Sequence, residues 1–242
     1  MNRLFLTLAA LALGAGAALA QNTVRIGTEG AYPPYNFIND ANELDGFERD
    51  LGDALCMRAN LTCEWVINDW DTIIPNLVAG NYDAIMAGMS ITEARAKIIS
   101  FTQNYLQPEA SAYMTLAGKD ESVVNGVVAV QSNTIQGGFV AETSATLVEF
   151  PTPDETIAAV RSGEADTVLA ARAFLEPIVE ESGGKLIFVG EDQFIGGGIG
   201  MGLRQSDNEL RETFDAVITE MKQDGSLNEL IVKWFGEGTK LF

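Results

Sequence analysis

The sequence predicts an α/β protein with two lobes, each built on a parallel or mostly parallel β-sheet that is covered on both faces by helices. Short apolar, β-prone runs alternate with segments whose apolar residues have helical spacing. This alternation occurs in two similar blocks, and the second block begins after Leu106. A chain of 242 residues organised in this way favours two lobes over a single core.

The first block reads as three strands that alternate with three helices. Gly80-Asn81 ends the second of these helices, and a hydroxyl-rich turn precedes the third. Strands are predicted over residues 24–28, 63–67 and 82–87, and helices over residues 47–58, 71–79 and 92–98.

The second block repeats the pattern, and a purely helical tail follows it. Strands are predicted over residues 111–117, 127–131, 147–150, 167–170 and 186–189. Helices are predicted over residues 134–142, 153–161 and 172–181, and in the tail over 208–222 and 226–234. We expect the tail to return to the first lobe. Lobe 1 would then comprise residues 21–108 and 202–242, and lobe 2 residues 109–201.

This arrangement requires two crossings between the lobes, and residues 194–203 of the second crossing are rich in glycine. Such a segment is expected to serve as a hinge, because glycine changes its backbone torsions with little steric penalty. A plain flexible loop is the alternative. A nucleotide-binding loop is not expected, because no Gly-x-Gly-x-x-Gly occurs in the segment and no helix follows it directly.

Composition indicates an exported protein. Residues 1–20 have one basic residue, an apolar run and the ending Ala18-Leu19-Ala20, which together predict a signal peptide cleaved before Gln21. No other uncharged apolar run approaches the length of a membrane span. The net charge of −19 argues against nucleic acid or an anionic membrane as partner. The chain has no histidine and therefore lacks the commonest general base and metal ligand.

The two cysteines, Cys56 and Cys63, lie at the end of a predicted helix and the start of the next strand. In an exported chain the default expectation is a disulfide that closes this short loop. A two-ligand metal site needs further ligands, and a redox pair needs a Cys-x-x-Cys spacing that is missing.

The turn from Met89 to Arg95 is the most specific local feature. Ser90 and Thr92 are both good N-cap residues, and Ser90 with Glu93 has the spacing of a capping box. Free amides at a helix start, a hydroxyl and the fork of Arg95 together predict a carboxylate receptor. An ordinary capped helix whose arginine faces water is the alternative.

Several ordered motifs extend over the mature chain: residues 27–37 (GTEGAYPPYNF), 44–51 (LDGFERDL), 68–71 (NDWD) with Ile74-Pro75, 82–86 (YDAIM), 90–95 (SITEAR), 130–134 (VQSNT), 223–225 (QDG) and 233–235 (KWF). As a set they resemble the periplasmic amino-acid-binding proteins of ABC importers (solute-binding protein family 3). The resemblance is to the lysine/arginine/ornithine-, histidine- and opine-binding branch. The cysteine pair also matches the lysine/arginine/ornithine and histidine binders. It implies the two-lobed type II periplasmic-binding-protein fold, with two hinge crossings and a ligand cleft between the lobes.

The resemblance also implies a ligand site without a cofactor or a metal. Arg95 would hold the ligand's α-carboxylate, with Ser90, the Gly88 backbone and Thr134 around the same group. The expected ligand-binding residues are Glu29, Tyr32, Trp70, Ala87, Gly88, Met89, Ser90, Arg95, Asn133, Thr134 and Ala171.

Three of these residues would select the ligand's side chain. Tyr32 and Trp70 would sandwich it, and Glu29 would bind a cationic group at its far end. Ordinary aromatic packing is the alternative for the two rings. A solvent-facing acid at the end of a strand is the alternative for Glu29.

The chain departs from the family pattern where the family usually has an aspartate for the ligand's α-ammonium, because that position is Ala171. Opine binders also lack this acid, and Arg172 would suit a second carboxylate if it faced the cleft; a surface arginine is the alternative. Ala87, Gly88 and Ile135 replace residues that are commonly polar, which reduces the polar contacts to a ligand.

The leading functional hypothesis is a periplasmic solute-binding protein, monomeric and without catalytic residues. It captures a polar amino acid, in particular a basic one, or an opine-like derivative and delivers it to an ABC permease. The first alternative is a cyclohexadienyl (prephenate or arogenate) dehydratase-like enzyme on the same fold, for which Glu29 and Glu48 are the candidate proton donors. The second is a sensory protein that presents its ligand to a membrane receptor.

Overall fold

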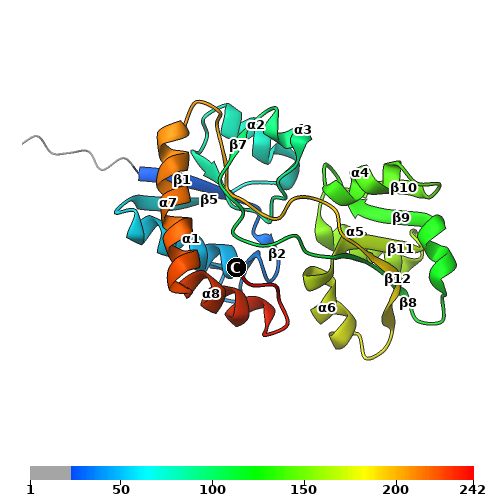
Figure 1. Cartoon of the computed structure of the whole chain (residues 1–242). Helices are drawn as coiled ribbons and strands as arrows, with labels where there is room; N and C mark the ends of the chain where they lie inside the picture. Colours follow the sequence, from blue (N-terminus) through cyan, green and yellow to red (C-terminus); the bar gives the residue numbers. More distant parts are fainter. Residues whose placement is uncertain (1–22) are drawn as a thin grey trace, which may run out of the picture.

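The computed structural model describes residues 23–242, so the predicted signal peptide lies outside the described residues. Two five-stranded sheets, each flanked by helices, lie side by side and are joined by two extended segments (Figure 1). A third, small sheet packs beside the first and was not predicted. It consists of β2 (Ala31–Tyr32), β3 (Asn36–Ile38) and β4 (Leu44–Asp45).

The first sheet combines early strands with one strand from near the end of the chain. Its order is β5-β1-β6-β13-β7, in which β1 is parallel to β5 and β6 whereas β13 is antiparallel to β6 and β7. The strands are β1 (Thr23–Thr28), β5 (Thr62–Ile67), β6 (Ala84–Ile85), β7 (Ser100–Phe101) and β13 (Gly202–Leu203). The strand predicted over residues 82–87 is thus shorter in the structure.

The second sheet has the order β10-β9-β11-β8-β12. Its strands are β8 (Ser111–Leu116), β9 (Val127–Gln131), β10 (Thr146–Phe150), β11 (Thr167–Ala171) and β12 (Leu186–Gln193). β8 is antiparallel to both β11 and β12. The expectation of mostly parallel sheets is therefore wrong in detail. The chain enters this sheet on β8 and leaves it on the adjacent β12. Because both crossings lie on the same side of the sheet, these two strands run in opposite directions.

Helices cover the sheets as expected. On the first lobe they are α1 (Phe47–Arg58), α2 (Ile73–Val78), α3 (Glu93–Ala96), α7 (Asn208–Asp224) and α8 (Ser226–Phe235), with a 3₁₀ turn at Trp70–Thr72. On the second they are α4 (Ile135–Ala141), α5 (Pro153–Ser162) and α6 (Arg172–Glu181), with a 3₁₀ turn at Glu121–Asn125. The tail helices α7 and α8 return to the first lobe and pack on α1 (Figure 1).

Each lobe has its own apolar core. In the first, Phe47 and Leu51 of α1 are fully buried in one cluster with Phe214 of α7. In the second, the main cluster gathers residues of β9, β11, α5 and α6. Tyr32 packs against both of these clusters, which places its ring where the lobes meet.

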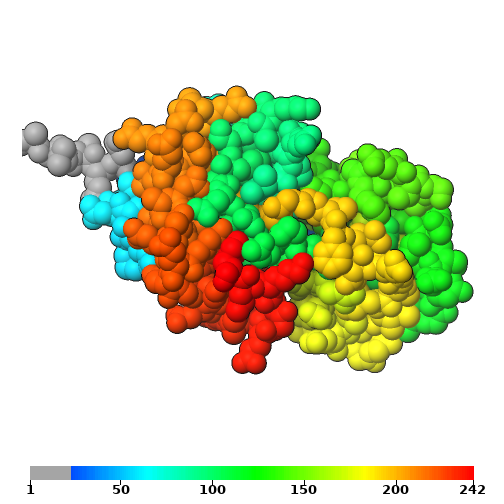
Figure 2. Space-filling model, in the orientation of Figure 1, coloured from blue at the N-terminus to red at the C-terminus, as the bar shows by residue number. Residues whose placement is uncertain are grey.

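The two crossings run beside each other, after β7 and after β12. Tyr105 donates its N–H to the carbonyl of Ile199 at 2.8 Å, and Ile199 donates to the carbonyl of Leu106 at 3.1 Å. Gly198 has φ +90°, and a Cβ there would lie 2.6 Å from the Leu106 oxygen, so the close approach requires glycine. Figure 2 shows the last residues of the chain beside the crossings on one face, where Lys240 lies 5.3 Å from the ring of Phe194.

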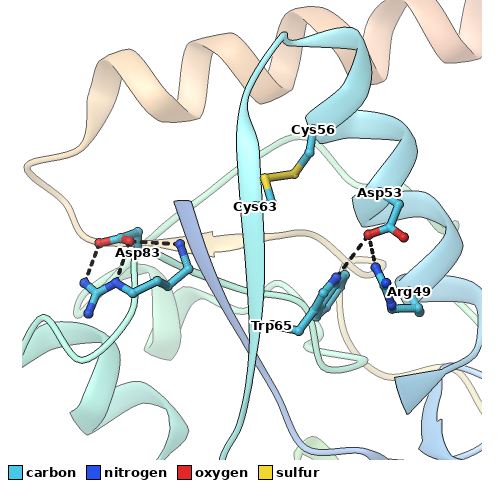
Figure 3. Close-up of a disulfide and its surroundings, with 7 residues drawn as sticks. Arg49, Asp53, Cys56, Cys63, Trp65 and Asp83 are labelled. Atoms are coloured by element: carbon cyan, nitrogen blue, oxygen red, sulfur yellow. Dashed lines mark hydrogen bonds and ion pairs between the residues drawn. A yellow bond between two sulfur atoms is a disulfide. The ribbon is translucent and has the colours of Figure 1, made fainter. Parts of the chain in front are cut away.

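The predicted disulfide is present. Cys56 on α1 bonds Cys63 on β5 and ties the helix to the edge strand of the first sheet (Figure 3). Trp65, two residues along β5, donates its indole N–H to Asp53 of α1 at 3.1 Å. The helix and the strand are thus joined by a covalent bond and by a side-chain hydrogen bond.

Candidate functional site

A cavity lies between the two lobes. It measures about 820 Å³ when its open side is included, within the roughly 300–1,000 Å³ of small-molecule sites. Its lining includes most of the expected ligand-binding residues. They are Glu29, Tyr32, Trp70, Ala87, Gly88, Ser90, Arg95, Thr134 and Ala171.

Two expected residues, Met89 and Asn133, do not line the cavity. The Met89 side chain is fully buried in a core cluster of the first lobe. Its chain neighbours Gly88 and Ser90 line the cavity instead. Asn133 has φ +57° and donates its amide to Asp71 at 2.9 Å, so its side chain bridges the lobes instead. The ligand-contact role predicted for these two side chains is not supported by their placement.

Arg95 lines the cavity, but its helix is capped differently from the prediction. Thr92, not Ser90, is the N-cap of α3 and accepts the N–H of Arg95 at 3.2 Å, so the predicted Ser90–Glu93 capping box is wrong. Ser90 instead forms a β-bridge with Ile199 of the second crossing. Backbone pairing thus places Ser90 in the cavity wall.

The Arg95 guanidinium is held by main-chain carbonyls from both lobes. It donates to Ser90 at 2.9 Å and to Asn133 at 3.1 Å, and it lies 5.2 Å from the centre of the Trp70 ring. Burial lowers its pKa to about 10, so the group stays charged at neutral pH. These contacts fix a cation in the cavity wall.

Glu48 fixes the loop that carries Gly88. Its carboxylate is fully buried and accepts the Gly88 N–H at 2.8 Å, the Asn36 amide at 2.7 Å and the Tyr105 hydroxyl. Burial raises the pKa of Glu48. Because Glu48 takes the Gly88 N–H, that amide does not face the cavity, and Glu48 itself does not line it.

Glu29 follows β1 and faces Gln131 at the end of β9 in the other lobe. The Gln131 amide donates to Glu29 at 2.6 Å and to the Pro151 carbonyl at 3.2 Å. Burial raises the pKa of Glu29 to about 7, which the Gln131 hydrogen bond offsets only in part. A cation beside this carboxylate would relieve the cost of its burial.

The two predicted aromatic walls each have one face already covered. Tyr32 stacks on Phe174 of α6, with ring centres 4.3 Å apart and planes 12° apart. Trp70 lies beneath Arg95 and donates its indole N–H to the Ser132 carbonyl at 3.0 Å. Only the remaining face of each ring is therefore available to a ligand.

The second lobe presents two helix starts to the cavity. The Thr134 hydroxyl caps α4 by accepting from Gly137 at 3.2 Å and donates to the Gln131 carbonyl at 2.7 Å, so it is engaged within its own lobe. Ala171 precedes α6 and donates its N–H to the Tyr32 hydroxyl at 3.0 Å. Arg172 pairs with Asp192 at 2.5 Å and does not line the cavity, as the surface alternative predicts.

Several polar residues of the cavity wall were not predicted from the sequence. Glu109 and Ser111 lie at the end of the first crossing, and Gln131 and Gln136 flank the start of α4. Tyr35 was quoted only as part of a motif, although its hydroxyl donates to Glu109 at 2.5 Å. An acid directly after Pro108, in the segment predicted to cross between the lobes, was the signal that pointed to Glu109.

Residues 23–242 contain no helix with the length and apolarity needed to cross a membrane. Within the same part of the chain, no His, Cys, Asp or Glu side chains gather in a group of three or more suited to a metal ion.

Two lobes, paired crossings and a cavity between the lobes with charged residues in its wall define a ligand-binding protein of the two-lobed periplasmic type. The sequence matches bacterial extracellular solute-binding proteins, family 3, over residues 24–237, and the chain belongs to this family.

Two relatives and one solved structure show which members of the family the chain is similar to. The chain is 36% identical to the histidine-binding periplasmic protein of Escherichia coli K12, covering 93% of this chain and 91% of that protein. It is 32% identical to the octopine-binding periplasmic protein of Rhizobium meliloti, over 94% and 95% of the two chains. A periplasmic His/Glu/Gln/Arg/opine family-binding protein from Silicibacter pomeroyi, solved in complex with lysine, is 66% identical, with a TM-score of 0.88 over 90% of this chain and all of that one.

Proposed function

We propose that the chain captures a basic amino acid, with lysine as the first candidate, between its two lobes and delivers it to the membrane permease of an ABC importer. The observation that carries the proposal is that Arg95 and Glu29 both line the same cavity. A guanidinium suits an α-carboxylate, and a buried carboxylate suits a side-chain ammonium or guanidinium. The lysine complex of the Silicibacter pomeroyi relative supports this choice.

The remaining cavity residues complete the proposed site. Tyr32 and Trp70 would contact the alkyl stem through their free faces, and Ala87, Gly88 and Ser90 would line the head-group end. Thr134 would contribute its backbone N–H, because its hydroxyl is engaged as a cap. An opine-like derivative is the second candidate ligand, supported by the absence of an acid at Ala171.

We assign residues 21–108 with 202–242 to one moving lobe and residues 109–201 to the other. Contacts across the cleft support closure as the mechanism. Ser132 donates its hydroxyl to Asp71 at 2.6 Å, and Gln131 and Ala171 reach Glu29 and Tyr32. A ligand that adds contacts to both lobes would shift the population toward this closed state.

The proposal includes a monomeric protein, exported by the segment 1–20 to the periplasm, whose partner is the permease. It includes no catalytic step. Glu48 is sealed beneath the cavity wall, which removes one of the two proton donors considered for a dehydratase, although Glu29 remains in the cavity.

Calorimetric titration tests the proposal. The mature protein is unfolded and refolded to remove bound ligand, and lysine, arginine, ornithine, histidine, glutamine, octopine and nopaline are titrated. We expect micromolar or tighter binding of lysine or arginine and weaker binding of glutamine. Binding confined to opines would reject the basic amino acid in favour of the opine alternative. Conversion of prephenate or arogenate by the protein would contradict the absence of catalysis.

A further inference from the structure

A second carboxylate, Glu109, lies in the cavity at a different place from Glu29. It belongs to the first crossing, immediately before β8, and its hydrogen-bond partner Tyr35 also lines the cavity. Both carboxylates raise the pKa of the Tyr32 hydroxyl, so each lies within electrostatic reach of that ring.

The sheet register relates Glu109 to Ala171. Ala171 of β11 pairs with Ser111 of β8. One residue beyond this pair, the Arg172 N–H donates to the Ala110 carbonyl at 2.9 Å, so the two chains stay paired there. Glu109 stands two residues before Ser111, the first residue of β8, and it lines the same cavity as Ser111 and Ala171.

Glu109 has no cationic partner in the described part of the protein. Within residues 23–242, no lysine or arginine nitrogen lies within ion-pairing distance of its carboxylate, and the Tyr35 hydroxyl is its hydrogen-bond donor. Burial raises the pKa of Glu109, so its ionised form is costly without a cation beside it. A ligand cation is the partner that this environment lacks.

We infer that Glu109 binds the α-ammonium group of the ligand, taking from the neighbouring strand the role that Ala171 cannot fill. This inference rests on the proposed function, since it assumes an amino-acid ligand. The cavity would then bind each of the three charged groups of a diamino acid: Arg95 the carboxylate, Glu109 the α-ammonium and Glu29 the side-chain cation.

The test compares L-lysine with 6-aminohexanoate, which lacks the α-ammonium, and with L-norleucine, which lacks the side-chain ammonium. Each is titrated into refolded wild type, Glu109→Gln, Glu29→Gln and the control Glu191→Gln, which removes an exposed acid of β12. Glutamine keeps an acceptor for the Tyr35 hydroxyl, and the melting temperature of each ligand-free variant checks its fold.

Glu109→Gln is expected to weaken lysine and norleucine by about 10- to 100-fold and to leave 6-aminohexanoate nearly unchanged, because it removes one charge-assisted hydrogen bond. Glu29→Gln is expected to weaken lysine and 6-aminohexanoate but not norleucine. Glu191→Gln should change none of them. Moving the acid, in Glu109→Gln combined with Ala171→Asp, should restore at least part of the lysine affinity.

Equal weakening of all three ligands by Glu109→Gln would overturn the inference, since it would mean that the Tyr35–Glu109 hydrogen bond only supports closure. Unchanged lysine affinity in that variant would also overturn it. Failure of the proposed function is read separately, from wild type: if it binds neither lysine nor any other basic amino acid, both the proposal and this assignment fall.

Discussion

The hydroxyl of Tyr32 accepts a hydrogen bond from the backbone N–H of Ala171 at 3.0 Å, across the cleft between the lobes. The same ring stacks on Phe174, three residues further along α6. A single side chain of the first lobe therefore makes both a polar and an apolar contact with the start of one helix of the second lobe. The backbone N–H of Ala171 thus helps to hold the two lobes together.

Replacing Tyr32 with Phe should keep the stacking on Phe174 and remove the acceptor for the Ala171 N–H. We expect about 10-fold weaker ligand binding, mainly through faster dissociation, because one hydrogen bond of the closed state is lost. Stopped-flow fluorescence and calorimetry measure both quantities. Tyr113→Phe, a change outside the cavity, is the control. An unchanged dissociation rate would contradict a role in closure.

Replacing Arg95 with Ala should weaken every α-carboxylate ligand by more than about 100-fold, because the buried fork has no replacement. Arg95→Lys should retain a charge but not the paired geometry, and should still weaken binding by about 10-fold. Calorimetric titration of lysine measures the losses, with the exposed Arg161→Ala as control. Wild-type affinity in Arg95→Ala would refute the carboxylate role.

Binding of a basic ligand should depend on pH through Glu29. Its pKa is about 7 in the ligand-free protein, and a ligand cation favours the carboxylate, so affinity should fall as the pH drops through 7. We expect lysine to bind about 10-fold more weakly at pH 6 than at pH 8. The ratio of lysine to norleucine affinity isolates Glu29 from other groups. Glu29→Gln should make that ratio independent of pH; a persisting slope would assign it elsewhere.

The contribution of Glu29 to the stability of the ligand-free protein depends on pH in the opposite direction to ligand affinity. Glu29 has a folded-state pKa above its ordinary value of 4.5, so the folded protein binds the proton more tightly than the unfolded chain. Its contribution to the free energy of unfolding is fully present at low pH and is lost as the pH rises toward 7. Chemical denaturation of Glu29→Gln beside wild type should show this slope in wild type alone.

Replacing Glu48 with Gln should destabilise the fold and disturb the cavity. Three donors converge on this carboxylate, and an amide group would set an N–H₂ against one of them. An unpaired buried donor costs about 1–3 kcal/mol, which lowers the melting temperature by about 2–12 °C in a chain of this size. Calorimetry and lysine titration check both effects, with the exposed Glu43→Gln as control. An unchanged melting temperature would contradict the network.

Removing the disulfide should affect stability and not the ligand. The bond closes a short loop with a sequence separation of 7, for which loop entropy gives about 2–3 kcal/mol, or about 5–10 °C in melting temperature. The double variant Cys56→Ser, Cys63→Ser should nevertheless bind lysine as wild type does, because neither cysteine lines the cavity. A reductant should reproduce the shift in wild type and leave the variant unchanged.

Local sequence signals predicted most elements accurately. The helices at Phe47–Arg58 and Arg172–Glu181 and the strand at Val127–Gln131 have the predicted bounds, because strong periodicity and clear end signals agree there. The Ser90 capping box failed because Ser90 pairs with Ile199, more than a hundred residues away, and the next hydroxyl, Thr92, became the cap. A long-range backbone contact thus overrode a local preference.

By itself, the sequence determined the alternation of elements, the two-lobed class, the cysteine pair and two charged residues of the site, Arg95 and Glu29. These follow from apolar spacing and residue chemistry, which are local properties. Only the tertiary structure decided which of those charges meet. Packing of the lobes sets Gln131 against Glu29 and carbonyls of both lobes around Arg95, and the folded chain brings Glu109 and Ala171 into the lining of one cavity. Such pairings depend on strand order and closure, and these are fixed by contacts between residues far apart in the chain.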